Sequence, residues 1–322
     1  MWWTAASAMP RLQKRMSLYH NPVLLNECIE GLAIRPEGVY VDATYGGGGH
    51  SRAILSRLGE GGRLVAFDQD PDAQGCAMDD QRFTLIGENF RHMKAFLRLN
   101  GIREVDGILA DLGVSSHQLD DAGRGFSTRM DGPLDLRMDT RGGCTAAELV
   151  NTLDCEELTK LLRDYGELPN AYAMARAICT ARAEKPLMTT LQLKEAVARL
   201  LPRGRENKYL AMLFQALRIE VNGELEALKQ MLTQAVELLR PAGRLVVIAY
   251  HSLEDRLVKH VMQTGNVEGE LRKDFYGNIL SDIRPVCRKA IAATPEEVAA
   301  NNRARSARLR IGEKVSQPIK TL

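Results

Sequence analysis

The stretch VDATYGGGGHS, from Val41 to Ser51, places an acidic residue near the end of a short apolar run and four glycines soon after it. A glycine-rich turn behind a strand is typical of places where the backbone comes close to a ligand. A phosphate-binding P-loop would continue with Lys, but His50 and Ser51 follow here. The dinucleotide fingerprint GxGxxG is matched only in part: if it starts at Gly46, Ser51 stands where its third glycine should be. The loop therefore indicates a ligand site and argues against a nucleoside triphosphate.

Strand-like and helix-like segments alternate around this loop. The strand-like runs are rich in Val, Ile, Leu and Phe and span residues 38–45, 62–70, 82–89, 105–113 and 243–250. Short apolar runs separated by helical patterns are typical of buried parallel strands. The repeated units predict an α/β protein with a doubly wound, Rossmann-like parallel sheet. Two further strand-like segments, 284–292 and 305–314, are placed to close that sheet.

Residues 119–205 interrupt the alternation. A loop dense in glycine and charged residues opens this segment, and only helical patterns follow. We expect a helical domain inserted between the fourth and fifth strands, over the carboxyl edge of the sheet. The sheet domain would then combine residues 16–118 and 206–322, with residues 1–15 as a disordered extension.

Composition indicates a globular protein of a reducing compartment. Its 322 residues are 45% hydrophobic, enough for one large domain or two ordinary ones. The 43 basic and 41 acidic residues nearly cancel, so net charge predicts no partner. The six cysteines form no CxxC pair, which argues against a disulfide framework and predicts no metal site. Because no signal peptide or membrane-length apolar run stands out, we expect a cytoplasmic protein without membrane contact.

Residues at the ends of the other strands narrow the choice of ligand. Asp68 ends the second strand, about 20 residues beyond the glycine loop, where an acid can accept hydrogen bonds from both ribose hydroxyls. Phe90 follows the third strand and would stack on an adenine, and Asp111 ends the fourth strand at the same edge. Together these positions suit S-adenosylmethionine better than NAD. Taken singly, Asp68 could instead cap the next helix, and Phe90 could be a core residue.

Seven longer motifs carry a resemblance to a known family. They are YHNPVLLNECIEGL, DATYGGGGHS, DGILADLGVSSHQLDDAGRGFS, DGPLDLRMD, FQALRIEVNGELEAL, HSLEDRLVKH and NNRARSARLRI. Through them the chain resembles the RsmH (MraW) family of bacterial methyltransferases from about Tyr19 to about Glu313. The resemblance implies a class I methyltransferase that uses S-adenosylmethionine. It also implies methylation of the exocyclic N4 amine of a cytidine in the decoding region of small-subunit rRNA, with the rRNA or the small subunit as partner. A homodimer is left open.

The resemblance also implies site residues, and the sequence departs from the family in places. The implied cofactor contacts are Gly48, Gly49, His50, Asp68, Phe90, Asp111 and Gln118. His50 and Gln118 rest on the resemblance alone. The sequence departs from the family at 207–212, where NKYLAM stands in place of His-Pro-Ala-Thr-Arg, and at Tyr250, where Phe is usual.

The ends of the fourth and fifth strands carry the candidate groups for chemistry. The cytosine amine is a poor nucleophile, and an enzyme can help by accepting its hydrogen bonds and aligning it with the methyl group. Asp111 could hold the cofactor, the target amine, or both. Ser252 and Asp255 have capping-box spacing, which leaves His251 as the candidate catalytic residue, facing the target base or an RNA phosphate.

Other features leave two interpretations open. The loop RGFSTRMDGPLDLRMD could lie over the site, or its alternating Asp and Arg residues could form internal salt bridges. The tail arginines fit rRNA contact and a strand face with ion pairs about equally well. These arginines are Arg303, Arg305, Arg308 and Arg310. Two other functional classes also stay open: an rRNA-binding assembly factor that holds the cofactor as a structural ligand, and a small-molecule methyltransferase.

Overall fold

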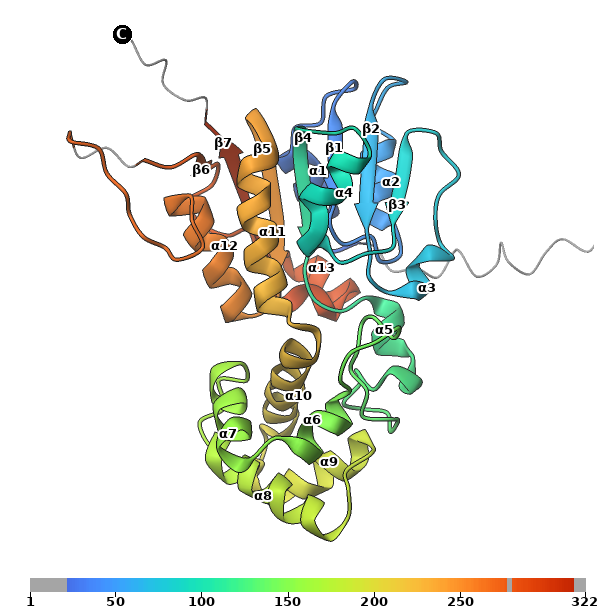
Figure 1. The fold of residues 1–322 in the computed structure, drawn as a ribbon, viewed down its shortest axis with the longest axis vertical. Coiled ribbons are helices and arrows are strands. Elements are labelled where there is room, and N and C mark those ends of the chain that lie inside the picture. The colour runs from blue at the N-terminus through green and yellow to red at the C-terminus, as the bar shows by residue number, and fades with distance from the viewer. Residues whose placement is uncertain (1–21, 277–279, 316–322) are drawn as a thin grey trace, which may run out of the picture.

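The computed structural model describes residues 22–276 and 280–315 and contains a seven-stranded sheet with helices on both faces (Figure 1). The strand order is β3-β2-β1-β4-β5-β7-β6. Strands β1 to β5 pair in parallel, whereas β7 runs antiparallel to both β5 and β6. Their bounds are β1 Val39–Asp42, β2 Arg63–Phe67, β3 Phe83–Ile86, β4 Val105–Asp111, β5 Leu239–Ala249, β6 Ile283–Pro285 and β7 Arg308–Lys314. The predicted doubly wound α/β fold is confirmed, and the extension predicted at residues 1–15 lies outside the described residues.

The central strands are buried on both faces, which explains their nearly continuous apolar sequence. In β5, Leu245 and Val247 pack on one face with α4, α11 and α12, while Val246 and Ile248 pack on the other with α1 and α2. Successive side chains of a strand point to opposite faces, so each face receives every second residue. The helices around the sheet are α1 Leu25–Leu32, α2 Gly49–Leu55, α3 Pro71–Gln74, α4 Met93–Leu99, α11 Glu224–Leu238, α12 Ser252–Thr264 and α13 Pro295–Ala300.

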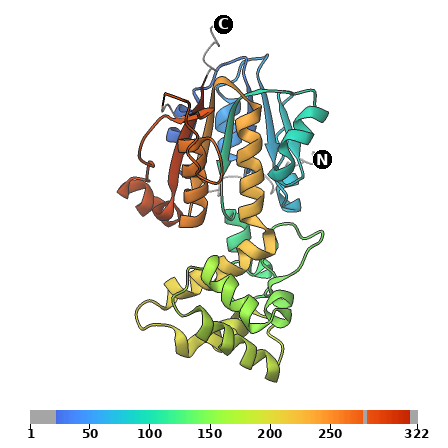
Figure 2. The same cartoon turned by 60° about the vertical axis from the view of Figure 1, so that its left-hand side comes forward.

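A second hydrophobic core lies in a group of helices beyond the carboxyl edge of the sheet, which we name the helical body (Figures 1 and 2). It is formed by α6 Ala146–Thr152, α7 Cys155–Asp164, α8 Ala171–Glu184, α9 Thr190–Val197 and α10 Glu206–Asn222. The buried residues Leu210, Leu213 and Leu217 of α10 belong to this core. By its packing, α10 therefore goes with the helical body. Among the described residues, no helix combines the length and apolarity needed to cross a bilayer.

The turn at Gly223 joins the helical body to the sheet. This residue has φ +57° and lies between the end of α10 and the start of α11. Its carbonyl accepts a hydrogen bond from Arg91 Nη2 at 3.2 Å, and Gln234 of α11 donates to the carbonyl of Arg91 at 2.6 Å. Arg91 lies in the 3-10 helix η2 (Phe90–His92), directly after Phe90. The turn is thus held against the segment that follows β3.

A buried ion pair holds the chain after β4 against the sheet. Both terminal nitrogens of Arg124 bond to the carboxylate of Asp70, at 3.2 and 2.9 Å. Arg124 also donates to the carbonyl of Met138 at 3.0 Å, so it fastens the charged loop as well. Two further Asp–Arg pairs of that loop are local: Asp135 with Arg137 at 2.8 Å is half-buried, and Asp139 with Arg141 at 2.9 Å is more exposed. The interpretation as internal salt bridges is confirmed, and a position of the charged loop over the site stays a prediction.

We predict that Arg124→Ala lowers the free energy of unfolding by about 3–5 kcal/mol, because it leaves the buried Asp70 carboxylate without its cation. Arg141→Ala, which breaks an exposed pair, should cost less than about 1 kcal/mol. Urea denaturation followed by circular dichroism measures both values. Equal losses in the two variants would contradict the anchoring role of Arg124.

Candidate active site at the carboxyl edge of the sheet

The glycine loop between β1 and α2 needs glycine for its own geometry. Gly46 and Gly48 have φ of +52° and +73°, in the left-handed region that other residues rarely adopt. A Cβ at Gly48 would lie 2.7 Å from Tyr45 Oη, and one at Gly49 would lie 2.3 Å from Cγ of Pro22. The loop therefore brings its backbone close to neighbouring groups at the point where β1 ends.

Asp68 joins the end of β2 to this loop. Its carboxylate accepts hydrogen bonds from Gly46 N at 2.7 Å and from Asp70 N at 2.9 Å. Burial raises the pKa of Asp68 to about 6, and these backbone bonds offset part of the rise. The alternative role as a helix cap is wrong, because Asp70 is the residue that caps α3, accepting from Asp72 N at 3.1 Å. Asp68 is left as a half-buried acceptor beside the loop.

Asp111, at the end of β4, has a partner on each carboxylate oxygen. Tyr250 Oη donates to Oδ1 at 2.8 Å, and His50 Nδ1 lies 3.8 Å from Oδ2. The other ring nitrogen of His50 lies 3.1 Å from the carbonyl of Val23, so this buried ring bridges two segments. Burial raises the pKa of Asp111, while His50 and Tyr250 act in the opposite direction. Asp111 and His50, two predicted site residues, are thus brought together.

Two groups at this edge escaped sequence reasoning. The hydroxyl of Tyr250 contacts Asp111, and the departure from the family's usual Phe was the signal that could have revealed it. Asp42, at the end of β1, is fully buried and accepts from Ser51 Oγ at 2.6 Å and from Thr44 N at 3.1 Å. Burial raises the pKa of Asp42. Asp42 thus bonds to residues on both sides of the four glycines and holds the loop in place.

Phe90 and Gln118 lie at this edge with most of their surfaces engaged. Phe90 is half-buried and packs against the core of the sheet. Gln118, in α5 (Ser116–Asp120), is buried, and its amide oxygen accepts from Ser115 N at 3.0 Å. Its amide nitrogen donates to Asp70 Oδ2 at 2.7 Å. The cofactor contact implied for Gln118 stays a prediction that rests on the resemblance.

The predicted capping box at the start of α12 is wrong. The N-cap is His251, whose Nδ1 accepts from Glu254 N at 3.4 Å, while the Glu254 carboxylate accepts from His251 N at 3.4 Å. The ring nitrogen of histidine reaches the N3 amide much as an Asp oxygen would. Ser252 instead donates to the carboxylate of Glu167 in the helical body, and Asp255 pairs with Arg310.

Two of the tail arginines form ion pairs within the chain, and rRNA contact by these arginines stays a prediction. Arg310 donates to both oxygens of Asp255, at 2.7 and 2.8 Å, which is the ion-pair interpretation. Arg303 contacts Asp120 at 3.0 Å, and Arg308 donates to the carbonyl of Ala307. Arg305 lies on the surface. Arg310 is thus engaged within the protein.

The sheet has the parallel strand order β3-β2-β1-β4-β5 and is extended by antiparallel β7. A glycine loop follows β1, and acids stand at the ends of β2 and β4. This is the Rossmann-like fold of class I methyltransferases. The sequence model described as the MraW methylase family matches residues 17–315, and the chain belongs to that family.

Close relatives carry a common name. The chain is 54% identical over 310 residues to the ribosomal RNA small subunit methyltransferase H of Amoebophilus asiaticus, covering 96% of this chain and 100% of that protein. The protein of the same name from Bacteroides thetaiotaomicron is 54% identical over 303 residues, covering 94% of this chain and 100% of its own. A solved rRNA methylase from Streptococcus thermophilus has a TM-score of 0.37 at 12% identity, covering 97% and 100% of the two chains, which is too distant to bear on the site.

We predict that Gly48→Ala destabilises the protein by more than the roughly 1–2 kcal/mol that left-handed backbone costs an L-residue. The excess comes from the new methyl group meeting Tyr45. Gly101→Ala is the matched control, because Gly101 has the same φ of +73° and a methyl group added there would meet nothing within 4 Å. Denaturant unfolding of the two variants measures the difference. If Gly101→Ala costs as much as Gly48→Ala, close packing around the loop is irrelevant.

Proposed function

We propose that this protein transfers a methyl group from S-adenosylmethionine to the exocyclic N4 amine of a cytidine in the decoding region of small-subunit rRNA. One observation carries the proposal: Asp68 tied to the glycine loop and Asp111 beside His50 lie along one sheet edge. It is supported by relatives that match nearly the whole chain and are named small-subunit rRNA methyltransferases.

The cofactor would lie across the carboxyl ends of β1, β2 and β4, the usual ligand position in open α/β sheets. The proposed contacts are Gly48, Gly49, His50, Asp68, Phe90, Asp111 and Gln118. Each oxygen of Asp68 accepts one backbone N–H and keeps a further lone pair for a ribose hydroxyl. Phe90 would provide the face on which the adenine stacks.

We predict that Asp68→Asn weakens S-adenosylmethionine binding by roughly 10- to 100-fold, the loss of about 1.5–3 kcal/mol that a hydrogen bond to a charged group provides. Because the pKa of Asp68 is about 6, wild-type affinity should also fall as the pH drops through that value and the carboxylate becomes protonated. Isothermal titration calorimetry from about pH 7.5 to about pH 5 measures both effects.

The exposed Asp79 supplies the matched control, and Asp79→Asn should bind the cofactor like the wild type. A wild-type affinity that stays constant over the pH range, or an Asp68→Asn variant with unchanged affinity, would rule out Asp68 as the ribose acceptor.

Asp111 is the group we place nearest to the reaction. Its burial makes the carboxylate more basic than one in water, so it is a strong acceptor for the cofactor's amino group or the target amine. Catalysis would then consist mainly of alignment and electrostatic stabilisation of the amine as it becomes tetrahedral. The catalytic role predicted for His251 stays a prediction; the structure shows a side chain that is 8% exposed and caps α12.

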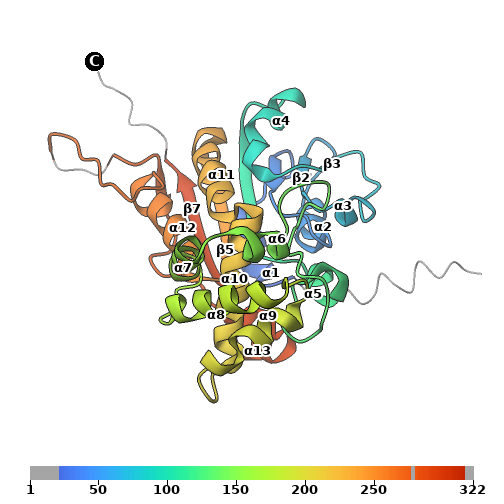
Figure 3. The same cartoon turned by 60° about the horizontal axis from the view of Figure 1, so that its bottom comes forward.

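The substrate would reach this edge from the side of the helical body, which lies in front of the sheet when viewed from that end (Figure 3). A cytidine must be unpaired or flipped out of its stack to present its amine. We propose that the helical body forms one wall of the RNA-binding cleft. Its limits, predicted at residues 119–205, would extend through α10 because that helix shares the same core.

We predict that cells lacking this protein lose one N4-methylcytidine from their small-subunit rRNA, as measured by mass spectrometry of rRNA digests. The wild-type gene and Asp79→Asn should restore the modification. Asp111→Ala should fail to restore it while the protein remains folded and abundant. If the modification is present without the protein, the proposed function is wrong. If Asp111→Ala abolishes methylation but still supports subunit assembly, methyl transfer and rRNA binding are separable.

A further inference from the structure

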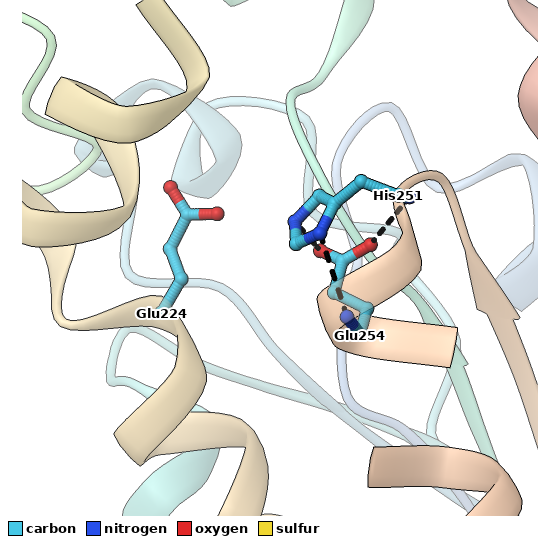
Figure 4. A group of neighbouring side chains, drawn as sticks. All are labelled: Glu224, His251 and Glu254. Carbon is cyan, nitrogen blue, oxygen red and sulfur yellow. Dashed lines mark hydrogen bonds and ion pairs between the residues drawn. The ribbon is translucent and has the colours of Figure 1, made fainter. Parts of the chain in front are cut away.

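Three side chains with metal-binding atoms meet where the helical body joins the sheet (Figure 4). Glu224 comes from the first turn of α11, and His251 and Glu254 come from the start of α12. One nitrogen or oxygen atom of each lies within 4.8 Å of the others. None of the three is among the proposed cofactor contacts. Cofactor binding therefore does not account for this cluster.

The Nε2 atom of His251 is buried and has no hydrogen-bond partner among the described residues. It lies 3.1 Å from Glu254 Oε1, an ion-pair distance, yet the ring N–H is not directed at that oxygen. A hydrogen bond weakens steeply when it is far from linear, so the short distance between these two atoms does not by itself make a hydrogen bond. Because the Glu254 carboxylate faces this nitrogen without a well-directed hydrogen bond, the nitrogen keeps bonding capacity that a ligand could use.

The separation of these two atoms matches two ligands of one metal ion. In a tetrahedral zinc site with bond lengths of about 2.0–2.1 Å, neighbouring ligand atoms lie about 3.3 Å apart and do not point at each other. The observed 3.1 Å, without hydrogen-bond geometry, fits that edge of a tetrahedron. One imidazole and two carboxylates suit zinc or a neighbouring transition metal better than magnesium or calcium, which prefer oxygen ligands alone.

The surrounding groups hold the carboxylates as an outer shell does. Glu254 Oε2 accepts from Tyr250 N at 2.9 Å, which leaves Oε1 turned toward the cluster. Each oxygen of Glu224 accepts from Arg218, at 2.9 and 3.0 Å. Ligating carboxylates in metal sites are commonly fixed by such second partners. Two carboxylates, one guanidinium and a neutral histidine carry one net negative charge before an ion binds.

Metal binding requires a small change in the histidine. His251 Nδ1 now accepts from Glu254 N, so a neutral ring carries its proton on Nε2. A metal ion on Nε2 moves that proton to Nδ1 and ends this bond. At 3.4 Å the bond is long, and the new Nδ1–H would face the Glu254 N–H, so metal binding also requires the ring to turn away from that amide.

We propose that Glu224, His251 and Glu254 bind one divalent transition-metal ion, with zinc as the best fit and a water molecule as the fourth ligand. The ion would clamp the start of α11 to the start of α12, next to the Gly223 turn through which the helical body joins the sheet. This role is structural and does not depend on the proposed methyl transfer. It differs from the absence of a metal site expected from the sequence, where only Cys and His spacing was considered.

The test uses the full-length protein, stripped of metal with a chelator and then titrated with zinc and, separately, with cobalt. The exposed Cys144 and Cys287 are first replaced by serine, because thiolates bind both metals. We expect one zinc ion per chain by calorimetry and elemental analysis. Cobalt should give the visible absorption of a nitrogen–oxygen site without thiolate charge transfer. Zinc should raise the Tm, since an ion that binds only the folded state stabilises it.

Glu224→Gln should weaken zinc binding by at least about tenfold and remove the zinc-dependent rise in Tm. Glu226→Gln is the matched control, because Glu226 is exposed on the same helix, two positions further on. Circular dichroism verifies that both variants fold. The proposal is overturned if the wild type binds no zinc above background, or if Glu224→Gln binds zinc as tightly as Glu226→Gln does.

Discussion

The hydrogen bond from the Gly46 N–H to the Asp68 carboxylate is the contact on which the site depends, because it joins the ends of β1 and β2. Parallel strands end together, and their last backbone groups have no further strand partner. Here acids accept from backbone groups just beyond the strand ends: Asp42 from Thr44 N, and Asp68 from Gly46 N and Asp70 N. The same carboxylates that make the edge suitable for a ligand are therefore the ones that hold it together.

The fold could be predicted because its physical cause is local in sequence. Strands buried on both faces require unbroken apolar runs, and helices between them require amphipathic ones. The glycine loop and the acids at Asp68 and Asp111 could be found for a related reason, since parallel order brings strand ends to one edge. Family membership then followed from long motifs that span the chain.

What could not be predicted depends on contacts between distant segments. Ser252 has ideal spacing for a cap, yet its hydroxyl bonds Glu167 of the helical body, and His251 takes the capping position. The meeting of Glu224 with His251 likewise requires the α10–α11 turn to be placed against α12. Residue spacing within one segment does not predict which distant segment it will contact. The roles of the site residues toward a bound cofactor remain predictions for the same reason.

The contact between Arg91 and the Gly223 carbonyl has a thermodynamic consequence. Arg91 follows Phe90 directly, and Gly223 is the turn through which the helical body meets the sheet. A small molecule stacked on Phe90 and a macromolecule held by the helical body would thus act on one shared joint. By thermodynamic linkage, if the bound small molecule changes the affinity for the macromolecule by some factor, the bound macromolecule changes the affinity for the small molecule by the same factor. The overall binding free energy would then not depend on the order in which the two ligands bind. The contact between Arg91 and Gly223 would set the coupling free energy between them.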